Sequence, residues 1–520
     1  MDAKTPKRLL RNDLDQFRLR TFLENLPPDE LDVRDQPTDL ADVADALHGN
    51  RKAVWFRKVN GADIGIVGNV VGSRSRLAIA MGVAPDKLLP EIQRRLTLQP
   101  ELIELGQNEA PVQEVVLMGA DADLTRLPVH LQHALDGAPY ISASIDYAID
   151  PRTGQTNSGM RRIMLRGPHE AGIDLNAPSD LRAIYQASVA RGEKLAVSFV
   201  VGAHPIDTLS ATMKIPVDEL GLVASLRGGS MPVVKCRTND IKVPADAELV
   251  IEGYLDERGY AEKEGPYGEY LGYYGVVKQN PVFHVTAITH RKDAVFQTAT
   301  ISGGFMDNTD TSNLEALRTE LNVWRALESV VREPIAVYAP VSAGGSMSVR
   351  FSMKPRFAGE ARSALYTVLG CVGAKNVFAV DGDIDIFNDK QMEWAFGTRF
   401  QPDRDLIVMS GMRTLPLDPS LPQGSRVGAK AGYDLTWPFG THDRLEVRVP
   451  APPTFAGKRF PSIEAALADG PKFFEELMTA VGSRDGREVV RTLGALRDKL
   501  SLDRDGEGRY FIKSGADAKK

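Results

Sequence analysis

The spacing of hydrophobic residues predicts helices and strands together in the first part of the chain. In residues 14–26, 39–49 and 87–98, apolar positions recur every three or four residues, which is typical of amphipathic helices. Residues 53–59 and 63–71 are short apolar runs of the kind that form strands. We therefore expect an α/β segment up to about residue 120.

The middle of the chain is richer in strand signals. Residues 140–150 and 156–165 flank a Pro-Arg-Thr-Gly turn, which predicts a β-hairpin. A helix is expected at 179–194, with Ser179 or Asp180 as its cap, and another at 215–229. Further strands are predicted at residues 195–202, 231–236, 247–255 and 282–290.

From about residue 311, helical and strand patterns alternate, which indicates a separate α/β domain. Helices are predicted at 312–331, 359–370 and 390–397, and strands at 335–340 and 376–387. Residues 411–462 are rich in Pro and Gly and predict a long ordered excursion. Two charged helices, at 471–481 and 487–500, precede a polar tail.

Composition narrows the class of protein. The chain has 520 residues, 43% hydrophobic and 25% charged, with a net charge of −6, so the basic excess of a general nucleic-acid binder is absent. Two cysteines exclude a disulfide framework. The first residues lack the apolar core of a signal peptide, and apolar runs fall short of the roughly 18 residues that a membrane span needs. We expect a cytoplasmic protein.

The familiar nucleotide and metal motifs do not fit. GNVVGSRS and SAGGSMS match neither GxGxxG nor the Walker pattern, and DGDIDIFND lacks the glycine and glutamate of a calcium loop. The eight histidines form no HExxH or HxH pair. His284 is expected in the core, and His130 and His133 at structural or surface positions.

The stretch EKEGPYGEYLGYYG, residues 262–275, is different because Glu264 and Glu269 flank a tight turn. One interpretation is a solvated β-turn with two exposed acids. The other is a turn that folds both carboxylates into one cavity, with Tyr267, Tyr273 and Tyr274 as its apolar walls. Two acids in one dry site push their pKa values apart, and a nearby arginine decides which one stays ionised.

EGPYGEYLGYY resembles the signature of the UbiD family, reversible decarboxylases that use prenylated flavin mononucleotide (FMN). Further segments are similar to the family in the same order: TNSGMRR, DELGLVASLRGG, VVKCRTNDIKVPADAELVIEG and VDGDIDIFNDKQMEWAFGTRFQPDRD. The matches extend from about residue 140 to 420. The resemblance is therefore carried by several independent segments.

The resemblance implies a catalytic set of Glu264, Arg162 and Glu269. Arg162, rather than the adjacent Arg161, stands five residues after Asn157, as the family pattern requires. Glu269 is expected to be the proton shuttle to the substrate carbon. Glu264 is expected to pair with Arg162 and to tune the cofactor and that shuttle.

The family holds its cofactor phosphate through Mn²⁺ or Mg²⁺, with K⁺ nearby. The resemblance implies Asn157 and Glu219 as ligands of this hard cation, together with Arg162 at the cofactor. The third ligand is usually a histidine about twenty residues after the asparagine, and this chain has none there. The matching position lies near Ser179 or Asp180, so either of these side chains, or a water, is left to substitute.

Two other segments resemble stretches of the family that line the site. SATMKIP carries Thr212 and Met213, which are candidates for contacting the flavin or form only the lead-in to a helix. ISGGFMDNTDTSN carries the candidate substrate contacts Phe305, Met306 and Asn308. The amide of Asn308 is suited to bind a ring heteroatom or a carboxylate, or to cap the following helix.

The chemistry explains the need for a special cofactor. Losing CO₂ from an sp² carbon leaves electrons in an in-plane orbital, and a covalent adduct with prenylated FMN provides the electron sink. The expected substrate is a small aromatic, heteroaromatic or α,β-unsaturated carboxylic acid. A separate flavin prenyltransferase would supply the cofactor, and neither nucleic acid nor a membrane is expected as a partner.

The resemblance also implies an α/β (α+β) fold in four parts. These are an N-terminal α/β segment (1–120), a split β-barrel that binds prenylated FMN (121–310), an α/β oligomerisation domain (311–460) and a C-terminal helical segment (461–520). The last helices would reach a partner subunit, so at least a homodimer is expected.

Two other functions stay open at this point. An ordinary FMN oxidoreductase on a split barrel would not need the Glu-Arg-Glu set. A non-catalytic subunit that binds flavin or metal is compatible with the missing histidine, whereas Arg162, Glu264 and Glu269 favour catalysis.

Overall fold

The computed structural model describes residues 14–422, 424–442, 444–497, 499 and 501–513. By their internal contacts the residues form two compact units. The first unit comprises the chain up to Lys354 together with Glu360–Leu435, and the second comprises Pro355–Gly359 and the chain from Thr436 onward. All of the predicted site residues lie in the first unit.

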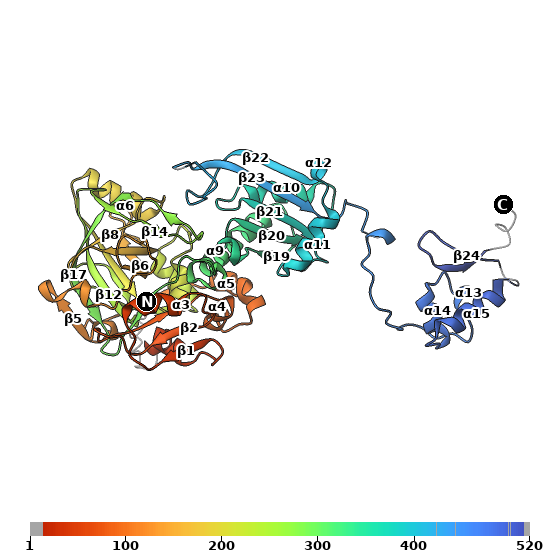
Figure 1. Cartoon of the computed structure of the whole chain (residues 1–520), viewed down its shortest axis with the longest axis horizontal. Coiled ribbons are helices and arrows are strands. Elements are labelled where there is room, and N and C mark those ends of the chain that lie inside the picture. Colours follow the sequence, from red (N-terminus) through yellow and green to blue (C-terminus); the bar gives the residue numbers. More distant parts are fainter. Residues whose placement is uncertain (1–13, 423, 443, 498, 500, 514–520) are drawn as a thin grey trace, which may run out of the picture. The chain divides into compact units, whose positions relative to one another are not determined.

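A closed, six-stranded antiparallel barrel forms the centre of the first unit (Figure 1). Its strand order is β12-β9-β6-β7-β8-β17, and β17 pairs back onto β12. The strands are β6 (Tyr140–Ile149), β7 (Thr156–Leu165), β8 (Glu170–Ile173), β9 (Leu195–Val201), β12 (Leu249–Leu255) and β17 (Val282–His290). The barrel and the hairpin β6–β7 confirm the fold expected for the middle of the chain.

The barrel interior is filled by large apolar side chains. Phe199 and Phe283 meet edge to face inside it, with ring centroids 4.9 Å apart. Helix α6 (Asp180–Ala190), which begins one residue after its cap Ser179, adds Leu181 and Tyr185 to the same core. Strand β5 (Val115–Met118) extends the sheet beyond β17.

The N-terminal segment shares a sheet with the strand that follows the barrel. Its order is β1-β2-β3-β18. The strands are β1 (Leu31–Arg34), β2 (Ala53–Phe56), β3 (Gly65–Gly68) and β18 (Val295–Gln297). A three-stranded sheet contains β11 (Lys242–Pro244), β10 (Ser230–Lys235) and β4 (Glu101–Leu105). Both sheets join residues from before and after position 121, so the two predicted domains are interlocked.

In the described residues, the helices before position 230 pack around these sheets. The predicted helix at 14–26 is shorter in the structure, where α2 covers Leu19–Glu24. A common apolar core contains side chains from α2, α4, α5, α7, α8 and α9, which ties the first segment to the parts that follow. The helices other than α2 and α6 are α3 (Leu40–Leu47), α4 (Arg74–Met81), α5 (Leu88–Arg95), α7 (Pro205–Ser210) and α8 (Glu219–Leu226).

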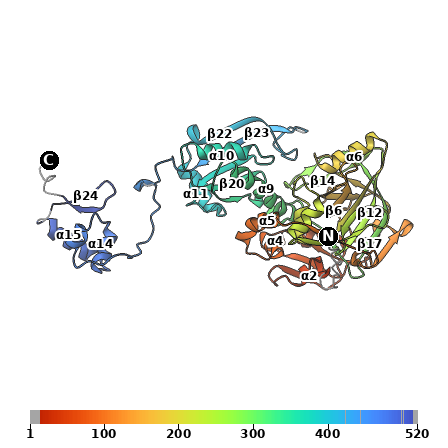
Figure 2. The ribbon, with the colours of Figure 1, turned by 180° about the vertical axis from the view of Figure 1, so that it is seen from behind.

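The part after about residue 311, where helices and strands alternate, contains a five-stranded sheet. Its strand order is β19-β20-β21-β23-β22, and α10 and α11 pack against it (Figure 2). Its strands are β19 (Pro334–Tyr338), β20 (Ser348–Met353), β21 (Asn376–Asp381), β22 (Leu406–Arg413) and β23 (Val427–Leu435). Its helices are α9 (Asp310–Glu328), α10 (Glu360–Leu369), α11 (Asp389–Arg399) and α12 (Pro402–Asp405).

The Pro- and Gly-rich stretch 411–462 differs from the expectation. Part of it, β23, is an interior strand that pairs with β21 on one side and β22 on the other. The two glycines and two alanines in VGAKAGYDL conceal this strand, because they weaken the apolar signal. The irregular connection begins after Leu435.

The second unit has its own small core. Helices α13 (Ile463–Ala468), α14 (Phe474–Val481) and α15 (Gly486–Arg497) pack together and against the hairpin of β24 (Leu502–Arg504) and β25 (Tyr510–Ile512). Helices α14 and α15 confirm the two charged helices predicted at 471–481 and 487–500. The hairpin replaces the start of the predicted polar tail, and residues 514–520 of that tail lie outside the described residues.

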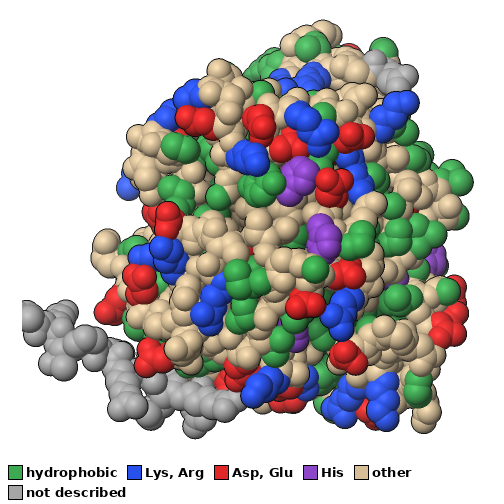
Figure 3. Space-filling view, turned by 90° about the vertical axis from the view of Figure 1, so that its left-hand side faces the viewer, with side chains coloured by type: hydrophobic (Ala, Val, Ile, Leu, Met, Phe, Trp, Pro, Cys, Tyr) green, Lys and Arg blue, Asp and Glu red, His purple; other side chains and the backbone are tan. Residues whose placement is uncertain are grey.

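Charge of both signs is mixed on the surface. On the face shown in Figure 3, acidic and basic side chains alternate with apolar and neutral ones. Within the described part of the chain, no helix is both long and apolar enough to cross a membrane.

Barrel closure generates a prediction at Gly253, beside the register shift between β12 and β17. A Cβ there would lie 2.1 Å from the His284 carbonyl oxygen and 2.6 Å from Cζ of Phe283. Gly253→Ala is expected to lower the free energy of unfolding by about 1–3 kcal/mol, because the strands must separate. Thermal unfolding measures the change.

The matched control is Gly397→Ala in α11, where an added Cβ has open space. It is expected to stabilise the protein by about 0.5–1 kcal/mol, because alanine favours the helix. Equal unfolding temperatures for both variants would contradict the view that Gly253 lets β12 and β17 pair closely and close the barrel.

Candidate active site

The two glutamates of the turn are carried by a doubly folded hairpin. β13 (Glu262–Glu264) pairs with β16 (Lys278–Asn280), and the shorter β14 (Tyr267–Gly268) pairs with β15 (Tyr274–Gly275). Gly275 leaves room for the carboxylate, because a Cβ at that position would lie 2.7 Å from Oε1 of Glu269. The local sequence thus bends both acids toward the barrel strand β7.

Arg162 of β7 binds both glutamates and a third acid. Its Nε donates to Oε1 of Glu264 at 3.0 Å, its Nη1 to Oε1 of Glu269 at 2.8 Å, and its Nη2 to Oδ2 of Asp174 at 2.8 Å. The side chain of Glu264 is fully buried, and those of Arg162 and Glu269 are 13% and 10% exposed. The alternative of a solvated turn is therefore wrong.

Asp174 and Lys278 belong to this cluster and were missed by the sequence analysis. Asp174 follows β8, and the antiparallel pairing of Ile163 with Ile173 sets it beside Arg162. Lys278 lies 3.3 Å from Asp174 and 3.7 Å from Glu269. Asp174 lies in none of the quoted motif segments, and its contact with Arg162 depends on the strand register that the structure shows.

Burial and neighbouring charges act in opposite directions on the pKa values of this cluster. Burial opposes ionisation of Asp174, but Arg162 and Lys278 outweigh it and hold its pKa well below the usual range. Burial also opposes the charge of Arg162, and the three acids overcome it and raise the pKa of the guanidinium. Glu264 gains an amide hydrogen bond of 3.0 Å from Asn280. Arg162 and Lys278 thus face three carboxylates.

Of the three tyrosines expected as walls, Tyr267 is buried beside the cluster, whereas Tyr273 and Tyr274 are exposed, so that part of the prediction is wrong. The guanidinium of Arg162 lies over the ring of Tyr267, 4.5 Å from its centroid, and Tyr140 packs against the same ring. Burial, together with Glu264, raises the pKa of Tyr140 above its usual value. The Tyr267 hydroxyl donates to Oε1 of Gln132 at 2.5 Å. The guanidinium of Arg162 therefore contacts Tyr267 with its planar face and the three carboxylates with its edges.

Asn157 and Glu219 also meet, as the metal assignment requires. Nδ2 of Asn157 donates to Oε2 of Glu219 at 2.9 Å, and the backbone N–H of Ser158 donates to the same oxygen. Within the described residues, Oδ1 of Asn157 is buried without a hydrogen-bond partner. Burial raises the pKa of Glu219 to about 7, opposed by the Ser158 N–H and reinforced by Asp146 and Asp180.

This donor set fits a hard cation. An amide oxygen without a partner beside a buried carboxylate is the oxygen-rich environment that Mn²⁺ or Mg²⁺ prefers. In the described part of the chain, no three His, Cys, Asp or Glu side chains cluster closely enough to hold a metal. Ser179 uses its hydroxyl to accept the Arg182 N–H at the start of α6, and Asp180 begins that helix.

The other predicted contact residues lie in three different surroundings. The Thr212 hydroxyl donates to the Leu209 carbonyl after α7, and Met213 is buried in the core below. Phe305 and Asn308 line a cleft with an empty volume of about 470 Å³, including its open part. Met306 lies instead beside Gly272 and Gly344, near Glu269's hairpin.

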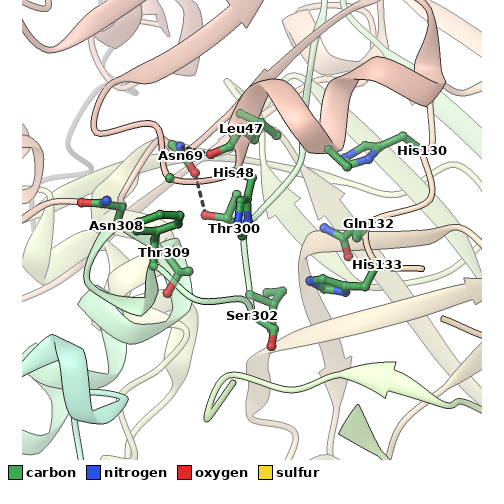
Figure 4. A pocket seen from close by; sticks show the side chains of 14 residues that line it. Leu47, His48, Asn69, His130, Gln132, His133, Thr300, Ser302, Asn308 and Thr309 are labelled. Carbon is green, nitrogen blue, oxygen red and sulfur yellow. Dashed lines mark hydrogen bonds between the residues drawn. The ribbon is translucent and has the colours of Figure 1, made fainter. Parts of the chain in front are cut away.

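Two histidines that we expected at structural or surface positions, His130 and His133, line the same cleft. His130, His133 and His48 are all in its wall, with Gln132 next to His133 (Figure 4). His130 is buried, whereas the side chain of His284 is 24% exposed and hydrogen-bonded to Asp256. The expected core position of His284 is therefore wrong, because its ring lies on the outside of β17.

His130 generates a pH prediction. Burial lowers its pKa to about 4, so between pH 6.5 and 4 the unfolded chain binds a proton that the folded chain does not. Lowering the pH therefore reduces the free energy of unfolding in this window. Between pH 8 and pH 5, His130→Gln is expected to lose about 2 kcal/mol less of this free energy than the parent. Urea unfolding at both pH values measures the difference. The same loss in parent and variant would contradict it.

Comparisons with known proteins cover all three parts of the first unit. Models of the N-terminal, Rift-related and C-terminal domains of 3-octaprenyl-4-hydroxybenzoate carboxy-lyase match residues 28–96, 104–305 and 312–435. An anhydromevalonate phosphate decarboxylase from Methanothermobacter thermautotrophicus is 28% identical over 441 residues, which are 82% of this chain and 99% of the relative.

Solved structures agree with this assignment. The UbiD-class enzyme HmfF from Pelotomaculum thermopropionicum, in complex with FMN, is 30% identical with a TM-score of 0.77, over 84% of this chain and 98% of HmfF. Vanillic acid decarboxylase from Sedimentibacter hydroxybenzoicus is 27% identical with a TM-score of 0.75, over 84% and 96% of the two chains. The family models and the solved structures thus agree, and the chain belongs to the UbiD family and is a carboxy-lyase.

Proposed function

We propose that the chain catalyses the reversible, non-oxidative decarboxylation of an aromatic, heteroaromatic or α,β-unsaturated carboxylic acid with prenylated FMN as its cofactor. The observation that carries the proposal is the arrangement of Glu264 and Glu269 on the buried guanidinium of Arg162. HmfF, which is similar along nearly its whole length, is described in complexes with FMN and with prenylated FMN.

The reaction needs both an electron sink and a proton donor. When CO₂ leaves an sp² carbon, the bonding electrons stay in an orbital that the substrate alone does not delocalise. Prenylated FMN, when bound, supplies the sink by bonding covalently to the substrate's unsaturated carbon. What remains for the protein is to orient the acid, exclude water and deliver a proton.

Glu269 is the residue best suited to carry that proton. Glu264 accepts from two nitrogens of Arg162 and from Asn280, and Asp174 lies between Arg162 and Lys278. Glu269 has a single short contact with Arg162 and a longer one with Lys278. Since three carboxylates face two cations, one added proton neutralises the cluster, and Glu269 holds it with the smallest loss of hydrogen bonds.

Glu264 and Asp174 act as positioning residues in this proposal. They occupy the Nε and Nη2 sides of the guanidinium, so that Nη1 is directed at Glu269. Their charge also keeps the arginine ionised in a buried site. The result is a fixed donor geometry that does not need to reorganise during proton transfer.

We propose that the cofactor and its ions bind in this same unit. We assign Asn157 and Glu219 to Mn²⁺ or Mg²⁺, with K⁺ nearby, because an unpaired amide oxygen and a buried carboxylate suit such a cation. Thr212 and Met213, like Arg162, are proposed flavin contacts. A flavin prenyltransferase would supply the cofactor.

The assembly and domain roles are proposed from the relatives. An evolved form of HmfF is described as dimeric, which supports a homodimer for this chain. We propose residues 121–310 as the cofactor-binding part, residues 311–460 for oligomerisation, and residues 461–520 for contact with a partner subunit. We also propose a cytoplasmic location, where flavin cofactors are made.

The substrate is proposed as a class. Relatives include vanillic acid decarboxylase and 3,4-dihydroxybenzoic acid decarboxylase from Klebsiella pneumoniae, which favours aromatic acids. Phe305 and Asn308 would contact the acid from the cleft, and Met306 from the side of the Glu269 hairpin.

The role of Glu269 generates the prediction that tests this function. Glu269→Gln is expected to keep bound cofactor but to lose CO₂ release by at least about a hundredfold, because general acid–base catalysis contributes that much. The loss should extend to the exchange of solvent deuterium into the product. Both are measured on a panel of aromatic and heteroaromatic acids.

Glu262→Gln is the matched control, because this glutamate lies on β13 of the same doubly folded hairpin with its side chain about half exposed. It should leave both rates unchanged. Unaltered turnover in Glu269→Gln would overturn the proton-shuttle assignment, and an absence of CO₂ release from every acid by the parent protein would count against the proposed reaction.

A further inference from the structure

Arg161 lies next to Arg162 on β7, and the proposed function leaves it without a role. Side chains alternate between the two faces of a strand, so Arg161 shares its face with Gly159 and Asn157 and not with Arg162. On the paired strand β6, Asp146 lies opposite Gly159 and therefore on this same face. A second arginine and a second acid thus lie on the strand face of the proposed metal ligand.

Asp146 fixes the guanidinium of Arg161. The carboxylate is fully buried, and Nε of Arg161 lies 3.2 Å from its Oδ1. Within the described residues, neither oxygen of Asp146 makes a hydrogen bond, so this ion pair is what compensates the buried charge. Burial raises the pKa of Asp146 to about 6, and Arg161 opposes the rise. Asp146 is therefore an anchor for Arg161.

The anchored guanidinium folds back along β7 toward Asn157. A Cβ on Gly159 would lie 3.2 Å from Oδ1 of Asp146 and 3.5 Å from Nη2 of Arg161, so both groups lie over this glycine. Gly159 stands between Arg161 and Asn157, and Asn157 is two residues, or about 7 Å, further along the strand. The guanidinium thus extends toward the proposed cation site.

Part of this guanidinium is left for a ligand. Nη1 donates to the Met160 carbonyl at 3.0 Å, whereas in the described part of the chain Nη2 makes no hydrogen bond. The side chain of Arg161 is 18% exposed, so a ligand can reach it. An arginine that is fixed at Nε and open at Nη2 is pre-organised to bind the oxygens of an anion.

A second cation lies within electrostatic reach of Arg161. Lys214 directly follows the proposed flavin contacts Thr212 and Met213, and within the described residues it forms no ion pair. Burial lowers the pKa of Lys214, the charges of Arg318 and Arg161 lower it further, and two nearby carboxylates oppose them. An anion placed between such cations would stabilise their charged forms.

We propose that Arg161, anchored by Asp146 and assisted by Lys214, binds the phosphate group of the flavin mononucleotide directly. A phosphate carries both the charge and the acceptor oxygens that the open edge of an arginine binds. This inference rests on the proposed function, because it takes a flavin mononucleotide as the cofactor. It goes beyond that function by giving the chain a phosphate contact that does not require a divalent metal.

Such a contact suits a chain with an incomplete set of metal ligands. Asn157 and Glu219 supply two side-chain donors, and no histidine stands where a third ligand is expected. The Ser179 hydroxyl at the matching position already accepts the N–H of Arg182. A bound cation can dissociate, whereas the charge of an arginine is permanently attached to the chain.

The test is equilibrium binding of FMN and of riboflavin, which lacks the phosphate, to the flavin-free full chain in EDTA, followed by flavin fluorescence. The parent is expected to bind FMN at least about tenfold more tightly than riboflavin, because the contact is a charge-assisted hydrogen bond. Arg161→Met is expected to remove that preference, since Lys214 alone lacks the fork, while riboflavin binding changes little.

Arg258→Met is the matched control. Nε and Nη2 of Arg258 donate to Oδ2 of Asp256 at 2.9 and 2.6 Å, so this is another arginine anchored to an aspartate, in the turn after β12. It should keep the full preference for FMN. If Arg161→Met fails to fold because Asp146 is left buried without its partner, the double variant Asp146→Asn/Arg161→Met replaces it, with the same expected loss.

Equal affinity of the parent for both flavins in EDTA, no binding of either flavin, or an unchanged preference in Arg161→Met would overturn the phosphate site. A preference for FMN that arises only after Mn²⁺ is added would also overturn it, since the metal would then be what binds the phosphate.

The measurement needs no turnover, so the two proposals separate. A preference that is lost in Arg161→Met, without CO₂ release from any acid by the parent, supports the phosphate site and contradicts the proposed reaction. CO₂ release without a preference for FMN contradicts the phosphate site alone.

Discussion

The arrangement of the first unit's functional groups depends on one buried cation. Arg162 is 13% exposed and satisfies three carboxylates that come from two different strand ends and a turn. Removing charges from water is costly, and a buried ion pair is tolerated only when hydrogen bonds replace the lost hydration. Here the guanidinium uses Nε, Nη1 and Nη2 at once, and its face lies on Tyr267. The fork geometry of arginine makes this possible, and a lysine has no equivalent.

The barrel provides the fixed frame for that cation. Arg162 extends from β7, whose pairing with β6 and β8 leaves its backbone little freedom. The hairpin that carries Glu264 and Glu269 is anchored in turn by Asn280 and by Asp136. A site that must direct a proton to one carbon atom gains from such anchoring, because misplacement of about 1 Å costs rate. The proposed metal ligands Asn157 and Glu219 lie on the same strand and on α8, so both groups share one rigid support.

Much of this could be predicted from the sequence because the signals were local. The Gly-Pro-Tyr-Gly turn, the hairpin around residues 151–154 and the spacing from Asn157 to Arg162 are all readable over a few residues. Asp174 was missed because its contact with Arg162 depends on strand register, which the amino-acid pattern near it does not encode. The pair His133–Asp136 was missed for a related reason. A histidine and an aspartate three residues apart are common on surfaces, and their role becomes visible only where Gly268 of a distant hairpin meets them.

The central claim is that this buried arginine cluster operates beside a prenylated flavin. The most direct measurement is mass spectrometry of the cofactor released from the chain after co-expression with a flavin prenyltransferase, with HmfF prepared in the same way as the loaded reference. The account predicts the mass of prenylated FMN from both proteins. Unmodified FMN, or no flavin, from this chain while HmfF yields the prenylated form would contradict it.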